Sequence, residues 1–172
     1  VVKLVHSLGW KVIQIGGVND RKIDICDGWI LKNESLGYWR NLFERSGLLI
    51  GVDSWTAHFA GILDIPQITF YGSTNARDVS SKKHYRMQKS KALIINTTAK
   101  CSPCHSFSCN RGENECPGFY LDEEAIKNFM REVKRQERFL TSLRKRPGWT
   151  FRHSVLKKMT GWIRQTIPRQ RW

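Results

Sequence analysis

The chain has 172 residues and carries 29 Lys and Arg side chains against 15 Asp and Glu, a formal net charge of +14. This length suffices for one domain with a full hydrophobic core, with or without a tail. A run of about 20 apolar residues, which a transmembrane helix needs, is absent, and so is a signal-peptide pattern. We therefore expect a cytoplasmic protein, and the start at Val1 within a predicted helix indicates a piece of a longer chain.

In residues 1–74, short apolar segments alternate with segments whose apolar residues have helical spacing. We predict helices over Val1–Leu8, Ser35–Ser46 and Ser54–Leu63, a turn of helix within Asp20–Asp27, and strands over Trp10–Ile15, Trp29–Leu31, Leu48–Val52 and Gln67–Tyr71. The helix after Ser35 is the clearest, because its apolar residues share one face and Gly47 follows its end. Alternating strands and helices predict an α/β fold, a Rossmann-like parallel sheet with helices on both faces.

The second half of the chain begins with less regular sequence. We predict a loop over Asn75–Lys91, a strand over Ala92–Asn96, a cysteine-rich loop over Cys101–Cys116, a long helix over Leu121–Leu143 and a basic amphipathic helix over Phe151–Ile163. Acidic residues in the first turn of the long helix suit the positive end of its dipole. Pro147 and Gly148 should end the first of these helices and separate it from the second.

Charge is distributed unevenly along the chain. Residues 1–120 have 15 basic and 10 acidic side chains, residues 121–172 have 14 and 5, and no acidic residue follows Arg138. We predict a nucleotide-sugar-binding domain over residues 1–135 and a basic helical tail over 136–172. Such a tail is typical of contact with anionic lipid, nucleic acid or an acidic partner, and equally of a solvated surface.

The turn after the Leu48–Val52 strand predicts an anion site. Ser54 is a good helix N-cap, so the amides of Trp55, Thr56 and Ala57 should point into the crevice at the carboxyl end of the strand. His58 follows within the first turn of the helix. The alternative is that Asp53 and Ser54 only cap the helix and His58 is a structural side chain.

The segment GVDSWTAHFAGILDIPQITFYGST, residues 51–74, resembles glycosyltransferase family 9, the heptosyltransferases that extend the lipopolysaccharide core. The family motif is a strand ending in Asp-Ser/Thr-Gly, a His three residues on, a helix, a Pro-led strand and a Phe-Gly-x-Thr turn. The matching positions are Asp53, Ser54, His58, Pro66, Gly72 and Thr74. Gly16-Gly17 at the end of an earlier strand, and the Cys-x-x-Cys at Cys101 and Cys104, also fit the family.

The resemblance implies the GT-B fold, in which two Rossmann-like domains enclose the active site. This chain would be most of the C-terminal, donor-binding domain, without its first strand and without the N-terminal domain that holds the catalytic Asp. The implied activity is inverting transfer of a heptose-like sugar from an ADP-sugar to a lipopolysaccharide-type or other glycan acceptor. The fragment alone should bind the donor poorly and catalyse no transfer.

The resemblance assigns donor contacts to the same turn. No Asp-x-Asp metal motif is present, so amides, the hydroxyls of Ser54 and Thr56, and His58 would stabilise the leaving diphosphate. The Asp53 carboxylate would repel phosphate, and we expect it to bind loop amides or a sugar hydroxyl. Trp55 departs from the family, which has Gly in its place: either the indole lines the donor pocket, or activity is altered or lost.

Further donor contacts are expected at the ends of the other predicted strands. Gly16, Gly17, Gly72 and Thr74 follow strands whose carboxyl ends should face one crevice. Nucleotide contacts explain these residues, and ordinary turn geometry explains the glycines equally well.

Four cysteines lie within 16 residues, as C-x2-C-x4-C-x6-C. They are Cys101, Cys104, Cys109 and Cys116. In a reducing cytoplasm such a group favours a structural metal, zinc or iron, over disulfides or free thiols, which stay open as alternatives. His105 could replace one ligand, and Cys26, alone in the first half, is most simply a small buried side chain.

The tail and the cysteine loop give two further hypotheses about partners. Residues 138–172 could lie on an anionic membrane, which would place the protein on the inner membrane face, or pack on the missing N-terminal domain. The alternative functions are a metal-stabilised basic module that binds nucleic acid, and a non-catalytic homologue of the transferases. Cysteine spacing unlike a zinc ribbon and the absence of stacking aromatics in the basic loop argue against nucleic acid.

Overall fold

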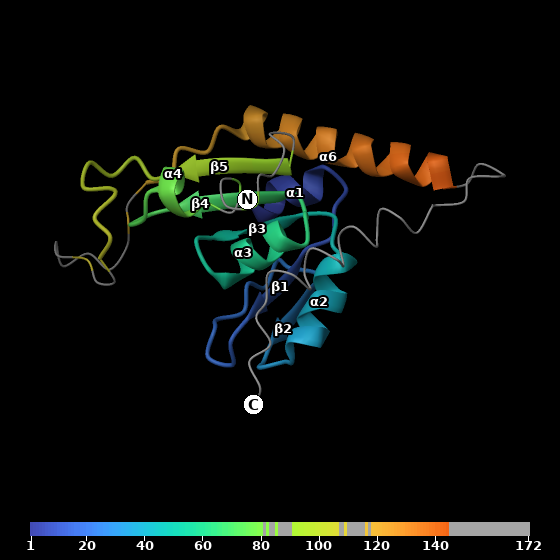
Figure 1. The fold of residues 1–172 in the computed structure, drawn as a ribbon, viewed down its shortest axis with the longest axis horizontal. Helices are drawn as coiled ribbons and strands as arrows, with labels where there is room; N and C mark the ends of the chain where they lie inside the picture. Colours follow the sequence, from blue (N-terminus) through green and yellow to red (C-terminus); the bar gives the residue numbers. More distant parts are fainter. Residues whose placement is uncertain are drawn as a thin grey trace. The chain divides into compact units, whose positions relative to one another are not determined.

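The computed structural model describes residues 1–80, 82, 85, 91–106, 109, 116 and 118–144. The chain divides into two compact units, Val1–Glu137 and Arg138–Trp172, and the description below concerns the first. Its elements, drawn in Figure 1, are α1 (Val2–Ser7), β1 (Ile13–Gly16), β2 (Gly28–Leu31), α2 (Leu36–Glu44), β3 (Leu49–Val52), α3 (Trp55–Ile62), β4 (Gln67–Tyr71), α4 (Ala76–Val79), β5 (Ala92–Asn96) and the start of α6 (Glu123–Arg144).

The strands are parallel, as predicted, but they form two sheets. β1 pairs with β2, with Ile15 opposite Ile30. β4 pairs with β3 on one edge and β5 on the other, with Ile68 opposite both Ile50 and Leu93. The prediction of one sheet was wrong in this respect, because β1 and β3 do not pair with each other.

Helices cover both faces of the strands, and the side-chain alternation of β3 shows how. Ile50 packs with Val5 of α1 and with Ile126 and Met130 of α6 in one apolar cluster. Leu49, the preceding residue, packs in a second cluster with side chains of α2 and α3. Because neighbouring strand residues point to opposite faces, α1 and α6 cover one face and α2 and α3 the other. This is the three-layer arrangement that the sequence predicts.

Most predicted elements have the expected type and differ only at their ends. Ser35 caps α2, accepting a hydrogen bond from the Tyr38 amide at 3.2 Å, and the predicted face of this helix buries Trp39 and Phe43. Gly9 ends α1 with a φ of +74°, the left-handed conformation that suits glycine. Cys26 is buried, at 7% exposure, as expected.

Two local predictions were wrong for the same reason, which is side-chain bonding to the backbone. Residues 20–27 form turns instead of helix, because the Gln14 side chain donates to the Arg21 carbonyl and accepts from the Ile23 amide, both at 2.8 Å. The predicted loop after residue 74 contains the short helix α4. Asn75 caps it, accepting from the Arg77 amide at 3.0 Å, a signal that the sequence contained.

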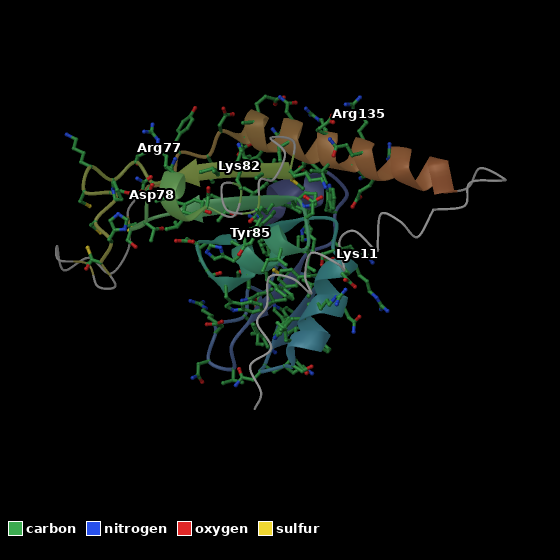
Figure 2. All side chains as sticks on the ribbon, viewed as in Figure 1. Lys11, Arg77, Asp78, Lys82, Tyr85 and Arg135 are labelled. Atoms are coloured by element: carbon green, nitrogen blue, oxygen red, sulfur yellow. The ribbon has the colours of Figure 1, made fainter. Side chains whose placement is uncertain are left out.

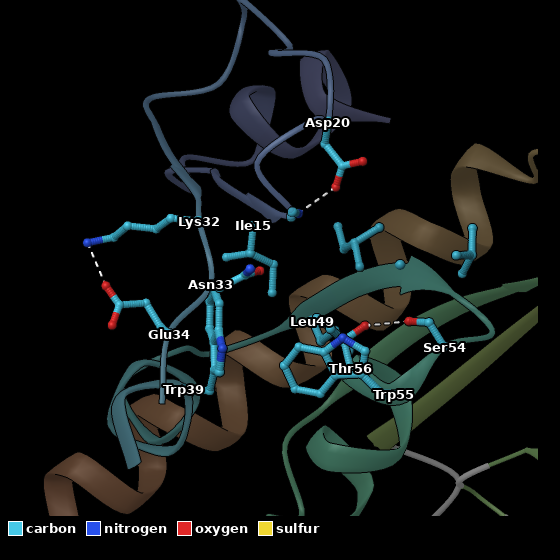
Figure 3. A pocket seen from close by; sticks show the side chains of 15 residues that line it. Ile15, Asp20, Lys32, Asn33, Glu34, Trp39, Leu49, Ser54, Trp55 and Thr56 are labelled. Atoms are coloured by element: carbon cyan, nitrogen blue, oxygen red, sulfur yellow. Dashed lines mark hydrogen bonds and ion pairs between the residues drawn. The ribbon is translucent and has the colours of Figure 1, made fainter. Parts of the chain in front are cut away.

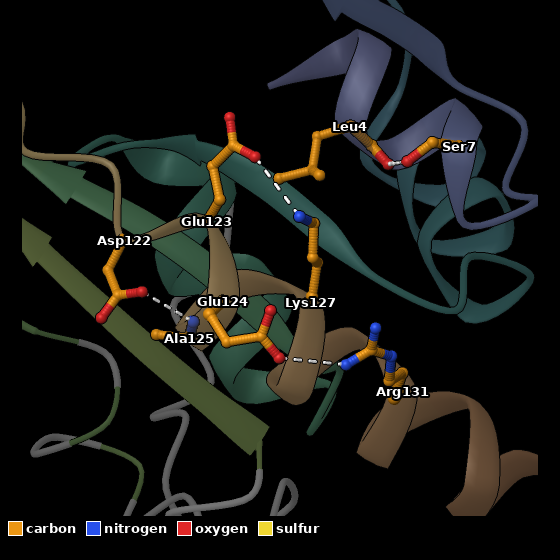
Figure 4. Close-up of polar contacts among 8 residues, drawn as sticks. All are labelled: Leu4, Ser7, Asp122, Glu123, Glu124, Ala125, Lys127 and Arg131. Atoms are coloured by element: carbon orange, nitrogen blue, oxygen red, sulfur yellow. Dashed lines mark hydrogen bonds and ion pairs between the residues drawn. The ribbon is translucent and has the colours of Figure 1, made fainter.

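The long helix α6 begins with the acidic cluster that the sequence indicates. Figure 4 shows Asp122 Oδ1 accepting from the Ala125 amide at 2.9 Å, and Glu123 and Glu124 paired with Lys127 and Arg131 at 3.4 and 3.2 Å. Negative side chains in the first turn stabilise the helix, because they lie at the positive end of its dipole. The predicted break at Pro147 and the helix over Phe151–Ile163 lie outside the described residues. Within those residues no helix is long and apolar enough to cross a bilayer.

Candidate functional site

The turn between β3 and α3 places the predicted anion-binding residues at the carboxyl end of β3. The Asp53 amide donates to the Phe70 carbonyl at 3.1 Å and so continues the pairing of β3 with β4. Ser54 is the N-cap of α3, as predicted, but its side chain makes no capping bond to a helix amide. Its hydroxyl instead lies 2.7 Å from the Thr56 hydroxyl.

The amides of this turn differ in what they can offer a ligand. Ala57 and His58 donate their amides to the Ser54 carbonyl at 3.1 and 3.4 Å. The predicted role of the Ala57 amide is therefore weakened, because that amide already has an acceptor. Among the described residues, the Trp55 and Thr56 amides have no acceptor. These two amides are the ones available to an anion.

Asp53 joins the turn after β3 to the turn after β4. Its Oδ2 accepts a hydrogen bond from Thr74 Oγ1 at 2.6 Å, which ties the β3–α3 turn to the β4–α4 turn. Its Oδ1 lies 3.9 Å from His58 Nε2. The predicted residues Asp53, His58 and Thr74 thus lie together, with the carboxylate between the hydroxyl and the imidazole.

His58 also has an aromatic neighbour that the sequence analysis did not single out. The ring centroid of Tyr85 lies 6.3 Å from that of His58 in an edge-to-face arrangement, and Figure 2 labels Tyr85 in this region. The His58 side chain is 37% exposed, so a ligand at this turn can reach it. Tyr85 lies in the irregular stretch predicted as a loop, where periodicity gave no reason to select it.

A cavity of about 460 Å³ lies between the carboxyl ends of β1 and β3 (Figure 3). Its lining includes the predicted residues Gly16, Gly17, Ser54, Trp55 and Thr56. The structure therefore brings the Gly-Gly turn and the α3 N-terminus to one cavity. Asp53, His58, Gly72 and Thr74 are not part of this lining, so the predicted site residues divide between the cavity and the turns after β3 and β4.

Polar residues that the sequence analysis left out also line the cavity. Asp20 accepts a hydrogen bond from the Gly17 amide at 2.7 Å, which fixes the turn after β1. Lys32 and Glu34 form an ion pair at 2.6 Å, and this hydrogen bond raises the pKa of Lys32. The position of Asp20 three residues after Gly-Gly is the signal that could have identified it.

Trp55 rests on a group of aromatic side chains from α2 and α3. Its ring centroid lies 5.9 Å from those of Trp39 and Phe59 and 6.2 Å from that of Phe43. The side chain stays 51% exposed and lines the cavity beside Trp39 (Figure 3). Aromatic contacts on one side thus hold the indole at the cavity wall.

The cysteine segment lies against the turn after β4. Ser102 Oγ donates to the Gly72 carbonyl at 2.7 Å, and the His105 amide donates to the Ser73 carbonyl at 2.8 Å. A β-carbon built on Gly72 would lie 3.2 Å from Cys116 Sγ. Gly72 therefore has a packing role, because a side chain there would crowd the cysteine.

None of the four cysteines of the predicted metal site forms a disulfide. Cys101 and Cys104 are exposed, and Cys109 and Cys116 are partly buried. Within the part of the chain that the structure describes, no three His, Cys, Asp or Glu side chains come together as metal ligands. Zinc or iron at these cysteines stays a prediction.

Comparison with known proteins adds no assignment. No family model, no curated protein and no solved structure matches this chain. The class that the fold defines is a mixed α/β protein with parallel strands and helices on both faces.

Proposed function

We propose that the crevice at the carboxyl ends of β3 and β4 binds the diphosphate of a nucleotide sugar. In this proposal the chain is the donor-binding half of an inverting glycosyltransferase that uses an ADP-sugar, heptose-like, and a lipopolysaccharide-type or other glycan acceptor. The donor and acceptor follow from the resemblance of residues 51–74 to glycosyltransferase family 9. The catalytic base would come from a part of the protein outside residues 1–172.

The observation that carries the proposal is the contact of Asp53 with Thr74, next to His58. The hydrogen bond of 2.6 Å joins two turns that are 21 residues apart in sequence, and it occupies the carboxylate with a hydroxyl. Among the hydrogen bonds of the described residues, the Asp53 carboxylate bonds this hydroxyl and not the Trp55 or Thr56 amides. Those amides, with the α3 dipole, favour an anion.

The chemistry of diphosphate departure fits these groups. Negative charge develops on the leaving phosphate as the bond to the sugar breaks, and donors already in position stabilise it without reorganisation. His58, when protonated, would add a charge-assisted hydrogen bond worth about 1.5 to 3 kcal/mol.

Nuclear magnetic resonance of the ¹⁵N-labelled chain tests the proposal at millimolar ADP, where weak binding is visible. We expect ADP to shift the amide signals of residues 53–58, and AMP to shift them less because it lacks the second phosphate. His58→Ala should weaken ADP binding roughly tenfold, since one charge-assisted bond is lost. Amide signals of residues 53–58 that do not shift when ADP is added would count against the proposal.

His6→Ala is the matched control. His6 is a partly buried histidine of the same domain, bonded to Asp27 at 2.9 Å and lying on α1. Its replacement should leave ADP binding unchanged. Equal weakening by both substitutions would mean that the effect comes from loss of stability, and the role of His58 would be withdrawn.

A further inference from the structure

We propose that Ser102 and His105, in the cysteine segment that follows β5, are positioning residues of the ADP site. They act through the turn after β4, residues 72–74, and through the hydrogen bond between Thr74 and Asp53. This role depends on the proposed binding of ADP at residues 53–58. It gives the cysteine segment a part in that site without a contact to the ligand.

The first two residues of the turn are bonded to the cysteine segment through their carbonyl groups. The Gly72 carbonyl accepts a hydrogen bond from Ser102 Oγ at 2.7 Å. The Ser73 carbonyl accepts one from the His105 amide at 2.8 Å. Two consecutive peptide groups of the turn are therefore fixed by residues about 30 positions later in the sequence.

Thr74, the third residue of the turn, makes the contact that reaches the ADP site. Its Oγ1 donates to Asp53 Oδ2 at 2.6 Å, which is short for a hydrogen bond between two oxygen atoms. Such bonds weaken quickly when the donor moves away or loses its alignment. The position of the preceding backbone therefore determines how well Thr74 can hold the carboxylate.

Ser102 is itself fixed by a series of bonds that begins at the sheet. The Thr97 amide donates to the Tyr71 carbonyl at 2.9 Å and continues the pairing of β5 with β4. The Ala99 amide donates to Thr97 Oγ1 at 3.2 Å, and the Ser102 amide donates to the Ala99 carbonyl at 3.0 Å. Ser102 thus offers its hydroxyl to the turn from a backbone that the strands hold in place.

His105 has an unusual backbone conformation. Its φ is +52°, in the left-handed region that residues with a side chain seldom adopt. The residue is exposed, so burial of the imidazole does not explain the conformation. Such a residue persists only where its surroundings determine the backbone, and here the amide is bonded to the Ser73 carbonyl.

Ser102→Ala tests the role of the hydroxyl, and Ser102→Thr, which keeps it, is the matched control. ADP affinity is measured by nuclear magnetic resonance titration, well below the melting temperature of each chain. We expect Ser102→Ala to weaken ADP binding about threefold, the lower range for one neutral hydrogen bond, and Ser102→Thr to restore the natural affinity. Natural affinity in Ser102→Ala, or equal losses in both variants, overturns the role of Ser102.

Gly9→Ala separates positioning from general stability. Gly9 lies at the end of α1 with a φ of +74°, so the substitution should destabilise the domain. We expect ADP affinity to stay at its natural value in this variant. A loss of affinity equal to that of Ser102→Ala would mean that both effects come from stability, and the role of Ser102 would be withdrawn.

A double substitution tests the route from Ser102 to Asp53. If Ser102 acts through Thr74, then Ser102→Ala should cause no further loss of ADP affinity in a chain that already carries Thr74→Val, because the contact it supports is gone. Substitutions at coupled positions are not additive, whereas those at independent positions are. Losses that multiply in the double variant overturn this route.

Two substitutions of His105 remove the same imidazole and differ in the backbone that they permit. Glycine adopts a positive φ without strain, whereas β-branched valine strongly resists it. We expect His105→Val to weaken ADP binding more than His105→Gly. Equal affinities of the two variants overturn the role of the His105 backbone.

A measurement without ADP allows the positioning role and the proposed function to fail separately. The side-chain carboxyl carbon of Asp53 should change its chemical shift in Ser102→Ala and keep it in Ser102→Thr. If this change occurs but the natural chain does not bind ADP, the proposed function fails and the coupling of Ser102 to Asp53 stands. If the natural chain binds ADP and Ser102→Ala alters neither the affinity nor the Asp53 signal, the positioning role alone is overturned.

Discussion

Thr74 Oγ1 donates to Asp53 Oδ2 across 2.6 Å and so joins the turns that follow β3 and β4. The Asp53 side chain is 19% exposed, so water competes only in part for the carboxylate. The contact connects two residues near opposite ends of the segment 51–74. It gives a physical reason for pairing an Asp after one strand with a Thr after the next.

Thr74→Val should reduce the free energy of unfolding by about 1 to 2 kcal/mol, because it leaves a partly buried carboxylate without its hydroxyl donor. Thr74→Ser is the matched control, since it keeps the hydroxyl. Urea denaturation measures both. If Thr74→Val destabilises the chain no more than Thr74→Ser, the hydrogen bond is not what stabilises the two turns.

Asp27 should make stability depend on acid pH. Its carboxylate accepts from the Val12 amide at 2.7 Å and from His6 at 2.9 Å, and these bonds lower its pKa. A lowered pKa in the folded state gives stability that is complete above the unfolded value, about 3.9 for Asp, and is lost as the pH falls through the folded value.

The substitution Asp27→Asn tests this dependence through urea midpoints measured across the acid range. We expect the variant to lose less stability than the natural chain as the pH falls, because its side chain does not titrate. Asp24→Asn, which alters an exposed carboxylate of the same loop, is the control. Parallel curves for the natural chain and Asp27→Asn would contradict the prediction.

Gly9 should resist substitution because of its backbone conformation. Its φ is +74°, where an L side chain costs about 1 to 2 kcal/mol. Lys134 Nζ also donates to the Leu8 carbonyl at 3.1 Å, so strain at this turn would disturb the contact of α1 with α6. Gly9→Ala should lower the melting temperature, whereas Gly28→Ala, where a β-carbon meets nothing within 4 Å, should not. Similar losses from both substitutions would refute the argument.

A structural metal at the cysteine segment should be detectable as zinc bound to the purified protein. We expect four-thiolate coordination to hold one Zn²⁺ per chain and its removal by a chelator to loosen the Gly72 turn, which contacts Ser102 and Cys116. Cys116→Ser should lower zinc content, and Cys26→Ala, outside the segment, should not. Zinc-free protein whose four thiols all react with a thiol reagent would instead identify them as free thiols.

Periodicity was sufficient to predict most of the helices and strands of residues 1–137. The apolar face of α2 buries Trp39 and Phe43, and the strands at Gln67–Tyr71 and Ala92–Asn96 have the predicted bounds. These predictions succeed because an amphipathic pattern records which side of an element is buried, and that is a property of neighbouring residues. The position of Ser54 as an N-cap is local in the same sense.

The sequence by itself therefore determined the order of the strands and of the longer helices, and the turn at residues 53–58. Only the tertiary structure decided that β1 and β3 do not pair with each other, that Asp53 contacts Thr74, and that Trp55 packs on the aromatic side chains of α2 and α3. A hydrophobic pattern specifies that a strand has neighbours without specifying which ones. Contacts between residues distant in sequence depend on how the elements pack, and that packing is a property of the whole domain.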